Sequence, residues 1–316
     1  SSLQFDALSS LLSLFLQTMP GSDLPVPILH PEAAFSYDTY LFDADGTLWH
    51  VLDPHPGAID FLRALLEKGK QVFIVTNNAI RSANKALEKL ENLGFKGLTE
   101  ENIVTPNTVL VDYIKRNPHF MEKSIYLIGT EGLKETLEEE LGSECFGVGP
   151  DHMPPHELFP HSIDIEREAS SVVVSDDPHF SYMKMIKAAN YLLDENCGFF
   201  ITNEDATFHT RSYALPGTGC LTAALRTAVL PRMPEVMGKP GDRMAAFLIN
   251  RFGIDPSKTL MIGDRLDTDI KFGNENGFDT CWVRTGVHGG EDVKKAMEGE
   301  DPSLIPRFTL HFQDLL

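Results

Sequence analysis

The sequence has little positive charge for its length. Among 316 residues, 27 Lys and Arg stand against 46 Asp and Glu, and the formal net charge is −19 at pH 7. Nucleic acids and anionic membranes are bound by basic surfaces, so neither is expected as the main partner. A site for a small anionic molecule would need positive charge supplied locally, by a metal ion, a lysine or backbone amides.

Cysteine is also scarce, and no Cys-x-x-Cys pair occurs. The four cysteines lie far apart in the sequence, at Cys145, Cys197, Cys220 and Cys281. This spacing indicates neither a zinc site nor a disulfide framework and favours a reducing, cytoplasmic setting. Residues 150–161 contain His152, His156 and His161, but their irregular spacing among prolines favours a surface loop over a metal site.

Long uninterrupted apolar runs are absent. Residues 3–19 are rich in Leu and Phe, but they are interrupted by Ser and contain no Lys or Arg. The run is too short to span a bilayer and lacks the basic residues of secretory and mitochondrial leaders. We expect an amphipathic helix that packs on the body of the protein or on a second subunit.

The chain is long enough for about two domains, and strand and helix patterns alternate along it. Continuous apolar runs predict strands that are buried on both faces, as in a parallel sheet. The strands predicted for this sheet are 37–43, 71–76, 235–237, 259–262 and 279–284. The helices predicted between them are 56–68, 82–93, 242–252 and one from about residue 268. The sequence therefore predicts a doubly wound, Rossmann-like α/β core.

The middle of the chain has an α/β pattern of its own. Strands are expected at 124–129, 171–175 and 199–202, and helices at 131–141, 181–194 and 217–229. This pattern predicts a self-contained α/β unit inserted into the core. The expected organisation is an N-terminal extension (1–36), a discontinuous core domain (37–117 and 233–316) and an inserted domain (118–232).

Two carboxylates, Asp43 and Asp45, lie at the end of the first predicted strand and precede a glycine turn at Gly46. Successive strand side chains alternate faces, so residues two apart point the same way. An Asp nucleophile beside an Asp acid/base is a known route to phosphoryl transfer. A calcium loop can also read Asp-x-Asp-Gly, but the further acidic ligands it needs are replaced here by apolar residues between Leu48 and Leu52.

Three further segments place polar residues directly after predicted strands. They are Thr76-Asn77-Asn78, Gly238-Lys239-Pro240 and Gly263-Asp264, with Asp267 and Asp269 behind the last. Singly, these segments are typical of a helix cap, a turn and a solvated helix start. Together with the first motif they favour one ligand crevice, because parallel strand ends meet at the same edge of a sheet.

The chemistry of these residues suggests distinct roles. Asp43 would attack phosphorus, and Mg²⁺ would reduce the repulsion between the carboxylate and the phosphate. The side chains of Asp43 and Asp264 and the main-chain carbonyl of Asp45 are the expected metal ligands. The Asp45 side chain would protonate the leaving oxygen and then deprotonate water. Asp269 lies further along and is expected to orient a metal-bound water.

Phosphate binding is expected from the remaining polar residues. The Thr76 hydroxyl and the amides near Asn77 and Asn78 would contact phosphate oxygens. Lys239 would add positive charge, and Pro240 is expected in the first turn of a helix whose N-terminus favours an anion.

With these four segments identified, the chain resembles the haloacid-dehalogenase-like phosphatases, whose four motifs occur here in the same order. The resemblance runs from Tyr37 to Gly286, and the inserted block resembles the large α/β cap of one subclass. Several segments are similar to phosphoglycolate, pyridoxal-phosphate and 4-nitrophenyl phosphatases. They are Asp45–Trp49, Thr76–Asn78, Asp177–Tyr182, Pro216–Gly219 and Gly263–Asp269.

The resemblance implies Mg²⁺-dependent hydrolysis of a small phosphorylated metabolite through an aspartyl-phosphate, in the cytosol, and often a homodimer formed through the caps. It implies the roles already given for the motif residues and adds His179 of the cap as a substrate contact. The segment around His179 is closer to the phosphoglycolate branch than to the pyridoxal branch. A pyridoxal-phosphate phosphatase, a phosphotransferase or phosphomutase, and a non-catalytic phosphate-binding scaffold are the alternatives.

Three places in the sequence depart from the pattern of the family. Thr47 stands where Val is common, residues 50–52 replace an early Gly, and residues 79–81 replace a common Ser or Thr. None of these changes removes a catalytic group. All lie near the expected site entrance, so they leave the identity of the substrate open rather than the type of reaction.

Overall fold

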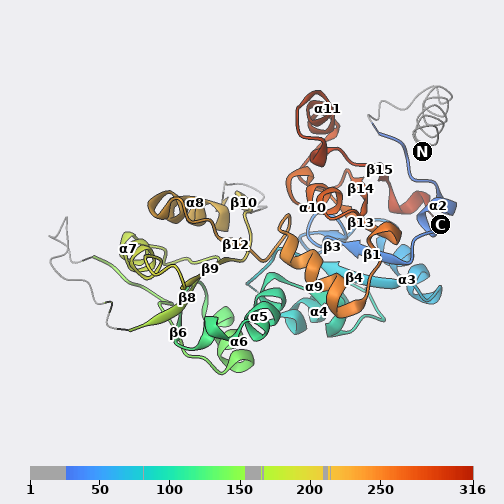
Figure 1. Cartoon of the computed structure of the whole chain (residues 1–316). Helices are drawn as coiled ribbons and strands as arrows, with labels where there is room; N and C mark the ends of the chain where they lie inside the picture. The colour runs from blue at the N-terminus through green and yellow to red at the C-terminus, as the bar shows by residue number, and fades with distance from the viewer. Residues whose placement is uncertain are drawn as a thin grey trace, which may run out of the picture.

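Two parallel sheets form the centres of two lobes (Figure 1). The computed structural model describes residues 26–80, 82–153, 165, 167–208, 213 and 215–315. The expected helix at 3–19 and the histidines His156 and His161 lie outside these described residues.

The first sheet contains six strands, and every neighbouring pair is parallel. Its spatial order is β15 (Phe308–Leu310), β14 (Asp279–Val283), β13 (Thr259–Gly263), β1 (Thr39–Phe42), β4 (Gln71–Val75) and β5 (Ile103–Val104). The chain runs outward from β1 through β4 to β5, and later returns to the other side of β1 with β13, β14 and β15. This is the predicted doubly wound sheet, and its order reverses at β1.

Helices cover both faces of this sheet (Figure 1). The helices of the first lobe are α2 (Pro31–Ala34), α3 (Ala58–Glu67), α4 (Ala83–Asn92), α9 (Asp242–Phe252), α10 (Lys271–Glu275) and α11 (Gly290–Glu298). All four residues of β1 are buried; Tyr40 and Phe42 pack in one apolar cluster, and Leu41 packs in another. Successive side chains of β1 thus pack on opposite faces of the sheet, as expected for a strand that is buried on both faces.

The second sheet contains five parallel strands. Its spatial order is β12 (Glu235–Val236), β9 (Gly198–Ile201), β8 (Ala169–Val174), β6 (Ser124–Ile128) and β7 (Cys145–Phe146). The helices of this lobe are α6 (Glu131–Leu141), α7 (Tyr182–Tyr191) and α8 (Thr218–Val229), and two short strands, β10 (Thr207–Phe208) and β11 (Leu215–Pro216), form an antiparallel pair. The predicted inserted α/β unit therefore has a sheet of its own.

One predicted strand belongs to the other sheet. Residues 235–237 were expected in the core sheet, but β12 pairs with β9 of the second sheet. A two-residue strand shows no pattern that distinguishes one parallel sheet from another, because both bury the same kind of apolar run.

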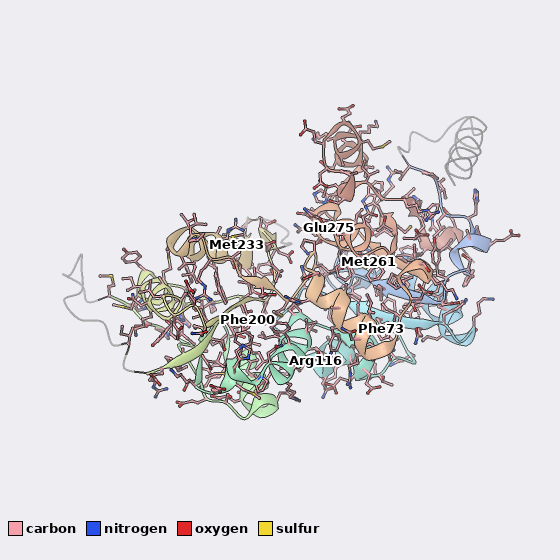
Figure 2. The ribbon with its side chains drawn as sticks, viewed as in Figure 1. Phe73, Arg116, Phe200, Met233, Met261 and Glu275 are labelled. Atoms are coloured by element: carbon pink, nitrogen blue, oxygen red, sulfur yellow. The ribbon has the colours of Figure 1, made fainter. Side chains whose placement is uncertain are left out.

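The two lobes share an apolar layer around α5 (Pro106–Arg116), which was not predicted. The layer joins Phe73 and Met261 of the first sheet to Phe200 of the second. Figure 2 shows these three side chains in their lobes, with Arg116 at the end of α5. The expected boundary at residue 117 therefore follows a helix that packs against both lobes.

Hydroxyl side chains mark the starts of four helices. Ser82, Thr105, Thr130 and Ser181 each accept a hydrogen bond from the backbone N–H three residues on, at the N-termini of α4, α5, α6 and α7. Such caps satisfy N–H groups that have no partner within the helix. None of the described helices has the length and apolar composition needed to cross a membrane.

The predicted helix 242–252 is confirmed as α9, but two details at predicted helix starts differ from the prediction. Pro240 was expected in the first turn, but α9 begins at Asp242, and Gly241 is its N-cap. The helix expected from about residue 268 begins earlier as a π-helical segment, η4 (Leu266–Ile270), which continues into α10. π-Helical segments are rare and often lie at functional sites, and sequence spacing does not reveal them.

All four cysteines are free, and three of them are buried. Burial raises the pKa of the Cys145 thiol to about 12 and that of Cys197 to about 11, and it raises the pKa of Cys281 well above its usual value. Cys220, in the first turn of α8, is exposed. The thiolate is the reactive form, and burial disfavours it in Cys145, Cys197 and Cys281. Cys220 is therefore the cysteine expected to react.

We therefore expect Ellman's reagent at pH 8 to modify one thiol of the native protein quickly and all four after denaturation. A Cys220→Ser variant should lose the fast phase and keep its melting temperature. Rapid modification of two or more thiols in the native wild-type protein would contradict the described packing.

Candidate active site

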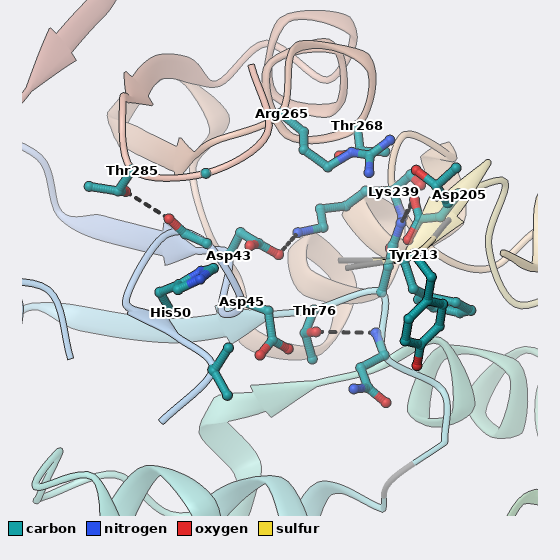
Figure 3. Close-up of a pocket in the computed structure, with 17 residues that line it drawn as sticks. Asp43, Asp45, His50, Thr76, Asp205, Tyr213, Lys239, Arg265, Thr268 and Thr285 are labelled. Atoms are coloured by element: carbon teal, nitrogen blue, oxygen red, sulfur yellow. Dashed lines mark hydrogen bonds and ion pairs between the residues drawn. The ribbon is translucent and has the colours of Figure 1, made fainter. Parts of the chain in front are cut away.

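The candidate site lies where the order of the first sheet reverses. Asp43 directly follows β1, Thr76 follows the neighbouring β4, and Asp264 follows β13 on the other side. Ligands of open α/β sheets bind at the carboxyl ends of strands at such a switch point. A cavity of about 590 Å³ opens here and is lined by residues of both lobes (Figure 3).

Three carboxylates converge around one ammonium group. Asp43, Asp264 and Asp269 each offer an oxygen, and these oxygens all lie within 4.8 Å of one another. The Lys239 Nζ is 2.7 Å from Asp43 Oδ1 and 2.8 Å from Asp269 Oδ1, and it donates to the Val75 carbonyl at 2.5 Å. Lys239 is 1% exposed, so the charge is held in a nearly dry environment.

The local electrostatics follow from burial. Burial raises the pKa of Asp43 well above its usual range, with Lys239 opposing the rise and the other carboxylates adding to it. Burial and the charge of Asp269 raise the pKa of Asp264 to about 7. Burial lowers the pKa of Lys239, but Asp269 and Asp43 outweigh this, so its net pKa lies above the usual value. One ammonium does not neutralise three carboxylates, so this set of oxygen donors suits a divalent cation.

Two glycines allow the backbone to approach Asp264. A Cβ on Gly286 would lie 1.8 Å from Asp264 Oδ2, and a Cβ on Gly46, whose φ is +95°, would lie 2.8 Å from the same atom. The Val287 N–H donates to Asp264 Oδ2 at 2.7 Å, and the Thr47 hydroxyl donates to Oδ1 at 3.3 Å. Asp264 is thus fixed at the site by close backbone approach, for which glycine is suited.

Lys239 reaches this site from the second sheet, since it follows β12. The Asn77 side chain holds its backbone at both polar groups. Asn77 Oδ1 accepts from the Lys239 N–H at 2.8 Å, and Asn77 Nδ2 donates to the Lys239 carbonyl at 2.9 Å. We expected Asn77 as a phosphate contact, but its side chain joins the segment after β4 to the segment around Lys239. The backbone amide of Asn77 takes no part in these hydrogen bonds.

The second lobe contributes further contacts through the loop after β9. The Asn203 side chain donates to the Asn77 carbonyl at 3.1 Å, and Asn77 Nδ2 also donates to Asp205 Oδ1 at 3.1 Å. Burial raises the pKa of Asp205, and the nearby Arg265 opposes this rise. Asp205, Arg265 and Tyr213 line the cavity. The second lobe therefore contributes Asp205 and Tyr213 to the cavity lining, whereas Arg265 comes from the segment after β13 of the first sheet.

Asp45 has a more open setting than Asp43. Its side chain is 45% exposed, compared with 14% for Asp43. Asp45 Oδ1 accepts from the Trp49 Nε1–H at 2.7 Å and from Lys89 Nζ at 2.9 Å. Both Asp43 and Asp45 line the same cavity, as the strand alternation predicts.

The remaining predicted site residues differ in whether they line the cavity. Thr76 and Asn78 line the cavity, and the Asn78 N–H donates to the Thr76 hydroxyl at 3.1 Å (Figure 3). Asp269 contacts Lys239 and accepts from the Arg265 N–H at 3.0 Å, so its contacts orient Lys239. His179 is exposed, its N–H donates to Asp177 Oδ1, and it is not among the described residues that line the cavity.

Sequence reasoning missed the cavity residues Asp205, Arg265 and Tyr213. Asp205 had a detectable signal, because Asn203 and Asp205 follow a predicted apolar strand just as Thr76-Asn77-Asn78 do. No comparable pattern in the sequence marks Tyr213.

Comparison with known proteins agrees with this geometry. A family model described as haloacid dehalogenase-like hydrolase matches residues 40–142, and one described as HAD-hydrolase-like matches residues 236–308. The chain is 47% identical over 252 residues to a putative NipSnap protein of Caenorhabditis elegans. This match covers 78% of the chain but 48% of the relative, so the chain spans about half of that protein's length.

Another relative matches over most of its length. Phosphoglycolate phosphatase 2 of Arabidopsis thaliana is 37% identical over 262 residues, which cover 80% of this chain and 84% of the relative.

Solved structures of phosphatases have the same fold. A p-nitrophenyl phosphatase from Archaeoglobus fulgidus aligns with a TM-score of 0.73 and 26% identity, covering 89% of this chain and 98% of the other. A glycerol phosphate phosphatase from Mycobacterium tuberculosis, in complex with magnesium, aligns with a TM-score of 0.71 and 27% identity, covering 89% and 77%. The chain therefore belongs to the haloacid dehalogenase-like hydrolases and is a phosphatase of that family.

Proposed function

We propose that this phosphatase hydrolyses small phosphomonoesters with Mg²⁺ through an aspartyl-phosphate on Asp43. The observation that carries the proposal is the cluster of Asp43, Asp264 and Asp269 at the switch point of the sheet, with Lys239 paired to Asp43 and Asp269. A carboxylate held against an ammonium group at a ligand-binding strand end is suited to attack an anionic phosphoryl group.

The first step transfers the phosphoryl group to the protein. An Asp43 oxygen forms a bond to phosphorus, and the bond from phosphorus to the ester oxygen breaks. Asp45 donates its proton to that leaving oxygen. Water then attacks phosphorus, Asp45 takes the water's proton, and the acyl-phosphate bond breaks to release phosphate and Asp43.

The residues that would hold Mg²⁺ are Asp43 and Asp264 through their carboxylates and Asp45 through its main-chain carbonyl. The donor set fits, because the carboxylates are oxygen ligands already gathered within 4.8 Å and have more negative charge than Lys239 neutralises. Bound Mg²⁺ would supply positive charge that reduces repulsion between the nucleophile and the phosphate. Asp269, through its contact with Lys239, keeps the ammonium group directed at Asp43.

Phosphate oxygens would be bound by Lys239, the Thr76 hydroxyl and the backbone amides near Asn77 and Asn78. These groups line the cavity beside Asp43. They supply locally the positive and hydrogen-bonding character that the acidic chain lacks elsewhere.

The proposed substrate is a small phosphorylated metabolite of the phosphoglycolate or glycerol phosphate type. The cavity of about 590 Å³ is within the usual size range of small-molecule sites, and Arg265, Asp205 and Tyr213 give it polar and aromatic groups. The names of two similar proteins, a phosphoglycolate phosphatase and a glycerol phosphate phosphatase, support this class. The assembled Asp43, Asp45 and Lys239 argue against a scaffold without turnover.

The proposal extends to the cellular compartment and the oligomeric state of the protein. Free thiols support a cytoplasmic setting. A homodimer through the second lobe remains a prediction from the sequence.

The nucleophile can be tested with 4-nitrophenyl phosphate in the presence of Mg²⁺. We expect the native chain to release phosphate and Asp43→Asn to lose at least about a thousandfold in kcat, because the amide cannot form the acyl-phosphate. The same variant should melt as a single folded species. An Asp43→Asn variant as active as the native chain would refute the proposed mechanism.

Metal dependence can be measured by activity and by binding. We expect EDTA to abolish phosphate release and Mg²⁺ to restore it. Asp264→Asn should weaken Mg²⁺ binding, followed by titration calorimetry, by at least about tenfold, because one charged oxygen ligand is lost. Asp60→Asn, on the exposed surface of α3, is the matched control and should bind as the native chain does. Unchanged affinity in Asp264→Asn would exclude it as a ligand.

The position of Lys239 depends on Asn77, so Asn77→Ala should impair both stability and turnover. The variant leaves the Lys239 N–H and carbonyl without these partners, which should lower the free energy of unfolding by about 1–3 kcal/mol. Urea denaturation measures this change, and kcat should fall under conditions where the variant is folded. Asn84→Ala, exposed on α4, is the control. An Asn77→Ala variant with native stability and native kcat would show that Asn77 does not hold Lys239.

A further inference from the structure

Lys89 lies outside all four motif segments, yet it reaches the proposed proton donor. It belongs to α4, and its Nζ is 2.9 Å from Asp45 Oδ1. The same ammonium lies 4.5 Å from the centroid of the Trp49 ring, whose Nε1–H donates to the same Oδ1 at 2.7 Å. Lys89, Trp49 and Asp45 therefore form one contact group.

Both donors act on a single carboxylate oxygen. Among the residues that the structure describes, none donates a hydrogen bond to Asp45 Oδ2. The Gly46 N–H donates to the Trp49 carbonyl at 2.8 Å, so the Trp49 backbone is held against the turn that carries Asp45. Two donors on Oδ1 restrict rotation of the carboxylate and leave Oδ2 for exchange of a proton with a ligand.

Packing alone does not hold this carboxylate. Its side chain is 45% exposed, and it borders two cavities. The larger is the proposed substrate cavity. The smaller, of about 30 Å³, is lined by Lys89 and Trp49 as well as Asp45 and is large enough for a water molecule. Without the two donors, Asp45 would have room to adopt other rotamers.

The contact is poorly explained as a stabilising ion pair. The Lys89 side chain is 19% exposed and its partner is more exposed still, and pairs of this kind contribute little to the free energy of folding. Lys89 is not among the residues that line the larger cavity, so it does not contact a ligand there.

We propose that Lys89, acting with Trp49, is a positioning residue that holds the Asp45 carboxylate for proton transfer to the leaving group. This inference rests on the proposed function, in which Asp45 is the acid/base.

The leaving group gives a specific test, because the two ester types differ in their need for a proton. An alkyl phosphate such as glycerol phosphate expels a basic alkoxide that must be protonated, whereas 4-nitrophenolate leaves without a proton. The constant kcat/KM reports steps up to the first irreversible one, which is departure of this group. It therefore excludes the later hydrolysis of the aspartyl-phosphate.

The experiment compares Lys89→Met, which keeps the aliphatic stem over Trp49 but removes the charge, with the native chain on both esters. We expect kcat/KM for glycerol phosphate to fall at least about tenfold more than kcat/KM for 4-nitrophenyl phosphate. Lys89→Arg should restore most of the loss. Lys85→Met, exposed on the same helix, should behave as the native chain does. Trp49→Phe removes the indole N–H that donates to Asp45. This variant should change the ratio of kcat/KM for the two esters in the same direction as Lys89→Met.

The outcomes separate the two proposals. A ratio between the esters that is unchanged in Lys89→Met, with or without an overall loss, overturns the positioning role even if Asp43→Asn is inactive. Thermal melting of each variant identifies a loss of activity through misfolding. Such a loss would lower kcat/KM equally for both esters and would also count against the positioning role. Full activity of Asp43→Asn would instead overturn the proposed function and this inference with it.

Discussion

The ion pairs of Lys239 with Asp43 and Asp269 are the interaction on which the architecture of the site depends. A buried ammonium is costly to desolvate, and so are the carboxylates around it. Removing one partner of such a group typically costs about 3–5 kcal/mol, because the other charge remains buried. Lys239 follows a strand of the second sheet, whereas its partners follow strands of the first. The same contact therefore joins the two lobes and places positive charge at the proposed nucleophile.

This arrangement requires close approach of backbone segments. Gly286 and Gly46 allow the chain to pass against Asp264, and Asn77 binds both polar groups of the Lys239 backbone. Asn203 then ties the loop after β9 to Asn77. Much of the polar chemistry near the cavity thus supports one lysine rather than contacting a ligand directly.

The two motif carboxylates have different environments despite being two residues apart. Asp43 is 14% exposed and lies among other charges, which suits a nucleophile held beside an ammonium group and a cation. Asp45 is 45% exposed and is held by donors from outside the cluster, which suits proton exchange with a ligand and water. Environment, rather than residue type, separates the two proposed roles.

Local pattern was enough to predict most of the strands and helices and the gathering of Asp43, Thr76 and Asp264 at one edge. Strand ends of a parallel sheet meet by geometry, so a run of apolar residues followed by a polar one carries this information. Local pattern failed for the sheet to which β12 belongs and for the placement of Pro240 in the first turn of α9. The sheet membership of β12 depends on its distant partner strand β9, which local pattern does not identify.

The amino-acid sequence alone predicted the parallel α/β class, the inserted unit and the proposed reactive groups, because apolar periodicity and residue chemistry are local properties. Only the tertiary structure decided that Lys239 comes from the second sheet, that Asn77 binds its backbone and that Lys89 reaches Asp45. The contacts of Asn77 with Lys239 and of Lys89 with Asp45 join residues 162 and 44 positions apart, and no spacing rule relates such residues before the chain is folded.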